Sequence, residues 1–68
     1  DINKARYNDG ATPVLIASQN GHVEVVRALL ERGAIINKAD NNGSTPLMMA
    51  RRRNHHTIVR LLERALLK

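Results

Sequence analysis

Three consecutive arginines, Arg51 to Arg53, form the densest group of chemically capable side chains in this sequence. A guanidinium holds a carboxylate or a phosphate through two parallel hydrogen bonds. At the end of a helix, at least two of the three side chains would point toward one side and could bind an anion there. The alternative is a solvated helix end, because positive charge near the carboxyl end of a helix also suits the helix dipole. The sequence leaves both interpretations open.

The histidines offer a second kind of chemistry, metal binding. His55 and His56 are adjacent, and adjacent residues of a helix point in different directions rather than toward one ion. We therefore expect no metal site from His22, His55 and His56, and a structural role for His22 and His55. The chain has no cysteine, which excludes thiolate metal sites and disulfides.

Catalytic residues in a recognisable arrangement are absent from the sequence. The six carboxylates are scattered, and no histidine is placed to be oriented as a general base. Ser18 and Ser44 lack the Gly-x-Ser-x-Gly setting of a serine nucleophile. We predict a protein that is not an enzyme and uses no cofactor.

The chain has a formal charge of +5, and most of the excess positive charge lies in its second half. Residues 40–68 hold six basic and two acidic side chains, whereas residues 1–39 hold five and four. A basic face attracts acidic proteins, nucleic acid and anionic lipid through the same long-range field. Tyr7 is the only aromatic residue, so the chain cannot build the platform of rings on which single-stranded nucleic acid stacks.

Length and hydropathy limit the class of protein. A chain of 68 residues forms one domain at most and buries a smaller share of its surface than a larger domain does. No apolar run approaches the ~20 residues that a membrane span needs. The chain does not begin with Met and shows no secretory leader, so we expect a piece of something longer. The missing leader and the lack of cysteine favour an intracellular location, cytoplasmic or nuclear.

The segments that position these side chains occur twice in the sequence. Thr12-Pro13-Val14-Leu15 recurs as Thr45-Pro46-Leu47-Met48, an offset of 33 residues. Threonine accepts a hydrogen bond at a helix start and proline has the φ angle of a first turn, so each stretch predicts a helix. Self-similarity at this length indicates a stacked repeat, whose units cannot bury their apolar faces alone. The same offset pairs Asn8 with Asn41, Gly10 with Gly43, Ala17 with Ala50, His22 with His55, Val26 with Val59 and Leu29 with Leu62.

These residues resemble an ankyrin repeat. The family pattern Gly-x-Thr-Pro-Leu-His-x-Ala, then Gly-His-x-x-Val-Val and Leu-Leu-x-x-Gly-Ala, is met by residues 10–17, 21–26 and 29–34. The second copy meets it more loosely, at residues 43–50 and 55–62. The resemblance implies an all-α solenoid of two antiparallel helix pairs, joined by a projecting, hairpin-like β-turn loop. It also implies that His22 and His55 bind the backbone of a neighbouring turn.

Each copy is expected to hold a short buried helix followed by an amphipathic one. In the first copy the short helix begins at Pro13 and stops at Gly21, a left-handed position. The second helix opens at His22 and ends at Gly33. Its predicted buried stripe consists of Val25, Val26, Leu29 and Leu30.

The sequence of the loops predicts two turns and one inserted residue. Asp9-Gly10 and Asn42-Gly43 are turn dipeptides and are predicted to form the tips of the projecting loops. The tails Ile2-Asn3-Lys4 and Ile36-Asn37-Lys38 are offset by 34 residues, one more than the helices. We therefore expect one extra residue in the stretch 5–8.

The second copy departs from the pattern as a terminal repeat would. Asn54 replaces the glycine between the helices, and Glu63 takes the position of a buried leucine. Arg51 stands where the first copy has serine and the family prefers a small residue. With no glycine at Leu66, the last helix is expected to continue along the stripe Ile58, Val59, Leu62, Ala65 and Leu66, nearly to Lys68. Leu66 and Leu67 are either a loose end or a patch that binds a partner.

The resemblance implies one module over residues 1–68. Residues 1–7 would be the tail of a preceding repeat or a linker, 8–39 the first repeat and 40–68 the terminal repeat. Its expected function is non-catalytic binding of another protein, and an acidic protein suits the charge. In the family, partners lie against the turn tips and the inner helices. The matching positions here are Asn8, Asp9, Ala11, Gln19, Asn20, Asn41, Asn42, Ser44, Arg52 and Arg53.

Three alternatives stay open. The basic second copy could bind nucleic acid or anionic lipid through Arg51, Arg52, Arg53, Arg60, Arg64 and Lys68. The segment could instead cap a longer ankyrin scaffold and have no partner of its own. A fragment this short could also self-associate to cover its apolar faces.

Overall fold

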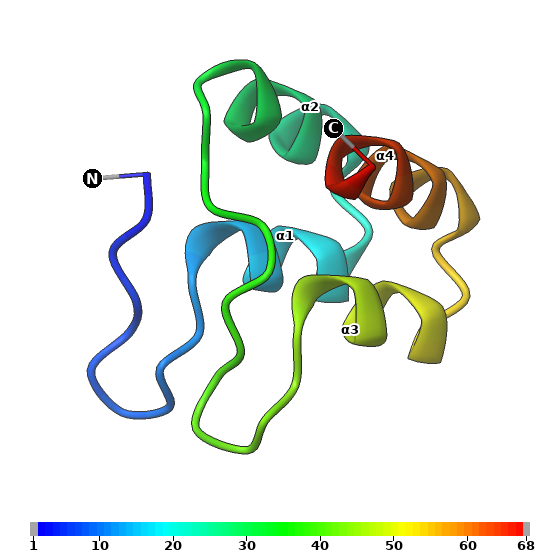
Figure 1. Ribbon diagram of the computed structural model, residues 1–68. Coiled ribbons are helices and arrows are strands. Elements are labelled where there is room, and N and C mark those ends of the chain that lie inside the picture. The colour runs from blue at the N-terminus through cyan, green and yellow to red at the C-terminus, as the bar shows by residue number, and fades with distance from the viewer. Residues whose placement is uncertain (1, 68) are drawn as a thin grey trace.

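The chain folds into two helix pairs that follow one another. The computed structural model describes residues 2–67. Within these residues it has four α-helices and no β-strand: α1 (Pro13–Asn20), α2 (Val23–Glu31), α3 (Pro46–Arg52) and α4 (His56–Leu66) (Figure 1). The predicted all-α architecture of two antiparallel pairs is confirmed.

Short polar signals set the ends of the inner helices. The Oγ1 atoms of Thr12 and Thr45 each accept a hydrogen bond from the backbone N–H three residues later, at 3.3 and 3.2 Å. Both predicted helix starts are therefore confirmed. Gly21 stops α1 with a φ of 76°, and Asn54 takes the same left-handed conformation, with a φ of 61°, just after α3. Asparagine is among the few other residues that visit this region readily.

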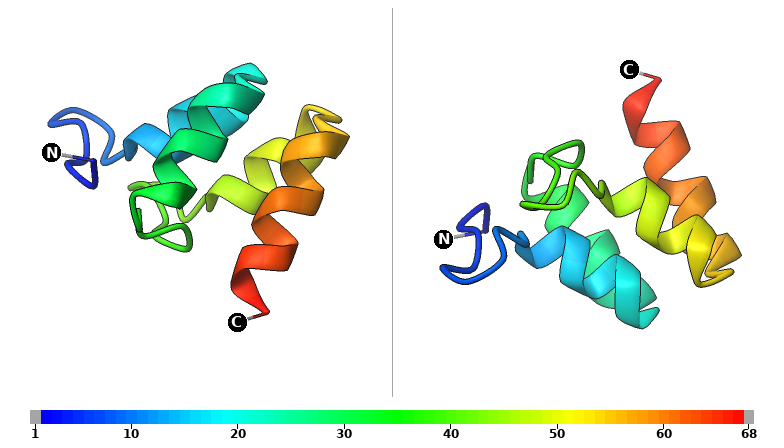
Figure 2. Two further views of the ribbon diagram at one scale, coloured as in Figure 1. Left: turned by 90° about the horizontal axis from the view of Figure 1, so that it is seen from above. Right: turned by 90° about the horizontal axis from the view of Figure 1, so that it is seen from below.

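The helices form two layers (Figures 1 and 2). α1 and α3 lie side by side in the inner layer, and α2 and α4 cover them as the outer layer. Each fully buried leucine or isoleucine between the layers contributes about 1.5–3 kcal/mol relative to an exposed one. The buried residues of this core are Val14, Ala17, Val26, Ala50, Ile58 and Leu62. A smaller cluster of Ala11, Leu15 and Met49 joins α1 to α3.

Val25 does not belong to the core, so this part of the predicted stripe is wrong. Its side chain is 48% exposed, whereas Ile58, 33 residues later, is fully buried. The two residues hold the same helical position. Ile58 is covered because α4 packs against the core that it shares with α2, whereas no helix pair of the described chain lies on the other side of α2.

The end of α4 follows the prediction only in part. α2 ends at Glu31, whereas α4 ends at Leu66, the position that corresponds to Gly33, so the last helix is longer by two residues, as expected. Leu66 is 43% exposed and Leu67 is 86% exposed, so the predicted buried stripe stops before them. Lys68, to which the helix was expected to extend, lies outside the described residues.

Candidate interaction surface

Two loops project beside the inner helices, and the second is the more regular one (Figure 1). The Asp40 N–H donates to the Ser44 carbonyl at 2.9 Å, and the Gly43 N–H donates to the Asp40 carbonyl at 3.0 Å. The Asp40 carboxylate accepts from the N–H groups of Asn42 and Ser44, both at 2.9 Å. Gly43 has a φ of 80°, as a turn tip requires. The predicted turn is confirmed.

The first loop repeats this pattern with one residue more. The Arg6 N–H donates to the Ala11 carbonyl at 2.8 Å, and the Gly10 N–H donates to the Arg6 carbonyl at 2.9 Å. Arg6 thus holds the place that Asp40 holds in the second loop. The predicted extra residue is therefore confirmed. Tyr7, which directly follows Arg6 in this longer loop, is wholly exposed.

The first loop has Arg6 at the position of Asp40, so it lacks the carboxylate that closes the second loop. An ion pair between Arg6 and Asp9 closes it instead. The Asp9 carboxylate accepts from Arg6 Nε at 3.1 Å, from a second Arg6 nitrogen, and from the Ala11 N–H at 3.0 Å. The Arg6 hydrogen bonds, followed by the Ala11 N–H, hold the pKa of Asp9 below its ordinary value of 3.8. The loop is therefore closed by its own side chains.

The two loops are joined to each other. The Asn41 N–H donates to the Asp9 carbonyl at 2.9 Å. Gly10 lies so close to the Asn41 side chain that a Cβ at this position would be 2.5 Å from Asn41 Oδ1. The turn tips therefore present their polar side chains at a fixed spacing, which lowers the entropic cost of binding.

His55 joins the far ends of the two helix pairs. Its Nε2 lies 3.0 Å from the Gln19 carbonyl, and since a carbonyl only accepts, Nε2 carries the hydrogen. The bond to a neighbouring turn is thus confirmed for His55. It is wrong for His22, which is exposed and makes no side-chain capping bond, because the described residues include no helix pair before α1.

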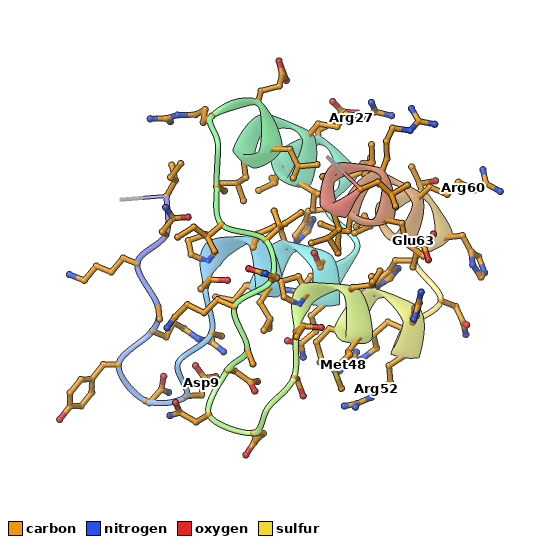
Figure 3. The ribbon with its side chains drawn as sticks, viewed as in Figure 1. Asp9, Arg27, Met48, Arg52, Arg60 and Glu63 are labelled. Carbon is orange, nitrogen blue, oxygen red and sulfur yellow. The ribbon has the colours of Figure 1, made fainter. Side chains whose placement is uncertain are left out.

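The three arginines face different surroundings. Arg51 Nη2 of α3 donates to Glu63 Oε2 of α4 at 2.6 Å, with the two side chains 59% and 46% exposed. Figure 3 shows Arg52 near Met48, on the side of α3 that faces away from Glu63, and Arg52 Nη1 lies 3.8 Å from the sulfur of Met49. Arg53 caps the helix and is exposed. Arg51 is therefore engaged within the molecule, while Arg52 and Arg53 have no acidic partner among residues 2–67.

The described chain thus combines capped inner helices, outer helices that cover them, and loops that are joined by a hydrogen bond. Residues 1–65 match a family model described as ankyrin repeats, three copies. The chain belongs to the ankyrin repeat family. Ankyrin repeats generally act as protein–protein interaction modules and are typically non-catalytic. A search of curated proteins finds no match to the chain.

Ankyrin geometry separates the ten expected contact residues into two groups. Ala11 is 1% exposed and packs with Leu15 and Met49, and Ser44 is 8% exposed. Each directly precedes a capping threonine and is buried, so neither side chain can contribute to a surface. The other eight are exposed or half-buried: Asn8, Asp9, Gln19, Asn20, Asn41, Asn42, Arg52 and Arg53.

Two features of the ankyrin surface were missed in the sequence. Met48 is 44% exposed beside Arg52, although its counterpart Leu15 is buried. The bond between Arg51 and Glu63 was missed as well. The signal was present, because both residues depart from the first copy and carry opposite charges.

Other kinds of site were also sought in this ankyrin module. Within residues 2–67, no three His, Asp or Glu side chains come close enough to hold a metal ion. The same residues contain no helix long and apolar enough to cross a membrane.

Proposed function

We propose that this ankyrin module binds an acidic segment of another protein across its turn tips and the free side of α1 and α3. The unpaired charge on α3 carries the proposal. Arg52 and Arg53 are exposed and have no acidic partner in the described chain. A carboxylate brought to them would form charge-assisted hydrogen bonds, which are stronger than neutral ones.

The surroundings of the two arginines support a protein partner. Met48 places an exposed apolar side chain next to Arg52. Methionine adapts to irregular apolar surfaces and is frequent at binding sites. The turn tips add polar side chains on a backbone that is already held in place. A surface that combines charge, an apolar contact and polar groups resembles a protein interface more than a uniform basic patch.

The basic residues that would serve nucleic acid or lipid are dispersed. Arg51 is bound to Glu63. Arg60 and Arg64 belong to α4, in the outer layer, whereas Arg52 points away from α4 (Figure 3). A phosphate backbone that contacts Arg52 would therefore miss the α4 arginines, which favours the protein partner.

A titration against two probes at several salt concentrations tests the proposal. The probes are a capped decapeptide of alternating glutamate and serine, and a DNA duplex of about 20 base pairs. We expect the peptide to bind at inner-helix and turn-tip amides with a shallow salt dependence. Tighter binding of the duplex with a steep salt slope would contradict the proposal and favour phosphate neutralisation. Sedimentation in the absence of either probe detects self-association.

A further inference from the structure

An open apolar groove lies between the outer helices, away from the arginines of α3. Its volume is about 370 Å³. Ligand sites of about 300–1,000 Å³ are usual, so the groove has room for one or two side chains of a partner. Five apolar residues and one arginine line it: Leu30, Ala34, Ile36, Leu61, Ala65 and Arg64.

The last turns of α4 form one side of the groove, and the end of α2 with the chain after it forms the other. α2 ends at Glu31, and Gly33, with a φ of 79°, turns the chain toward the next loop. At the corresponding position of α4 stands Leu66, which is still part of the helix and is its last residue. α4 therefore extends past the loop that follows α2, and no element of residues 2–67 covers the space between them.

Three exposed apolar residues are chain neighbours of the residues that line the groove. Ile35 is 51% exposed and lies between the lining residues Ala34 and Ile36. Leu66 and Leu67 are 43% and 86% exposed and directly follow the lining residue Ala65. A contiguous apolar lining that is open to solvent, as in this groove, is typical of an interaction site.

Arg64 places a positive charge at the groove that no acidic side chain of the described residues neutralises. Its side chain is exposed and has no acidic partner in the described part of the chain. Three other arginines are paired: Arg6 with Asp9, Arg27 with Glu24 and Arg51 with Glu63. The complement of this groove is therefore an apolar group with a carboxylate beside it.

We propose that the groove binds a segment of another protein in which a leucine-like side chain stands next to an aspartate or glutamate. The apolar side chain lies against Leu30, Leu61 and Ile36, and the carboxylate binds Arg64. The site shares no residue with the proposed surface on α3, so either can fail without the other.

Charge and shape disfavour two other occupants. A two-fold interface of this chain would set the same patch, with Arg64, against its own copy, and the like charges would repel. A fatty acid has the right chemistry, but an open groove leaves much of its chain in water, whereas small-molecule sites bury most of their ligand.

Amide chemical shifts of the ¹⁵N-labelled chain test this inference. The probes are the capped peptide with the sequence ADLLDA and its uncharged control ANLLNA. We expect the charged peptide to shift the amides of Ala34, Ile36, Leu61 and Ala65, and the control to bind more weakly. Arg64→Gln should weaken binding about two- to fivefold, as for an exposed ion pair.

Arg60→Gln provides the matched control. It removes the same charge from the same helix, one turn earlier, at a residue that does not line the groove. We expect it to change binding less than about twofold. Ala65→Leu, which fills the groove at constant charge, should abolish the shifts.

Four results would overturn the proposal. Equal losses in Arg64→Gln and Arg60→Gln would reduce the effect to net charge. Peptide shifts confined to α3 would place binding elsewhere. Groove shifts that grow with protein concentration alone would identify a second copy as the occupant. Octanoate that shifts the same amides at lower concentration than the peptide would identify a small amphiphile.

Discussion

Gly21 lies against the imidazole of His55, and this contact joins the two helix pairs. Its φ of 76° is left-handed, and a Cβ there would be 2.8 Å from His55 Cε1. Gly21→Ala should therefore lower the free energy of unfolding by about 1–3 kcal/mol, through backbone strain and displacement of the ring. Urea denaturation followed by circular dichroism measures the loss.

Gly33→Ala separates the two causes. Gly33 has a φ of 79°, but a Cβ there would meet no atom within 4 Å. This variant therefore reports backbone strain alone, and we expect it to lose less stability than Gly21→Ala. Equal losses would show that the His55 contact adds nothing.

Asp9 gives the first loop a dependence on pH. Its pKa in the folded chain is lowered, first by the hydrogen bonds from Arg6. The unfolded chain therefore binds this proton more readily, and the stabilisation is present above pH 3.8 and is lost as pH falls through the lower folded pKa. Unfolding free energies measured between pH 6 and pH 2.5 should fall less steeply in Asp9→Asn than in the natural chain. Identical slopes would contradict this account.

Much of the residue-level structure could be predicted from the sequence because it depends on local chemistry. A capping Thr12, a left-handed Gly21 or Asn54 and a turn at Gly43 each need only their own neighbours in the chain. The exposure of His22 could not be predicted, because the bond that its counterpart His55 makes needs a carbonyl from a neighbouring helix pair.

Among the elements, α3 and α4 are held together by an ion pair that α1 and α2 lack. Arg51 and Glu63 replace the Ser18 and Leu30 of the first pair. A double-mutant cycle of Arg51→Ser and Glu63→Leu should give a coupling free energy of about 0.2–1 kcal/mol, because both side chains are partly exposed. The coupling should fall in about 1 M salt. Additive losses at low salt would show that the bond contributes no stability.

Burial of an element depends on what lies beside it, and the sequence does not show this. Val25 and Ile58 occupy one helical position, yet only Ile58 has a helix pair against it. Ala11 and Ser44 were expected on the binding surface, but both are buried, and Ala11 packs with Leu15 and Met49. For a similar reason, the sequence did not show that Arg51 is paired while Arg52 and Arg53 are not. The partner of Arg51 lies twelve residues away on another helix.

The whole molecule has a small core for the number of residues it orders. Among residues 2–67, three of the nine buried apolar residues are alanines, which bury little area. Ordering each residue costs roughly 1–2 kcal/mol in backbone entropy, and stacked repeats usually need about three copies to offset that cost. We therefore predict that the isolated chain is only marginally folded. Circular dichroism on dilute chain should show a broad melt, and a cooperative, concentration-independent transition well above about 60 °C would contradict this.

Arginines on the inner and on the outer helices can be exchanged separately, which tests where the partner binds. Arg52 and Arg53 end the inner helix α3, whereas Arg32 and Arg60 lie on or directly after the outer helices. All four are exposed and without an acidic partner in residues 2–67, so exchanging either pair for glutamate changes the net charge equally.

Association and dissociation rates of the glutamate–serine decapeptide, measured for both double variants at two salt concentrations, test the account most directly. We predict that Arg52→Glu with Arg53→Glu weakens binding at least about tenfold, mainly through faster dissociation, and that the difference persists at high salt. Arg32→Glu with Arg60→Glu should mainly slow association at low salt. Helicity measured for each variant excludes unfolding as the cause. Equal losses that vanish at high salt would contradict the account, because only the net charge would then matter.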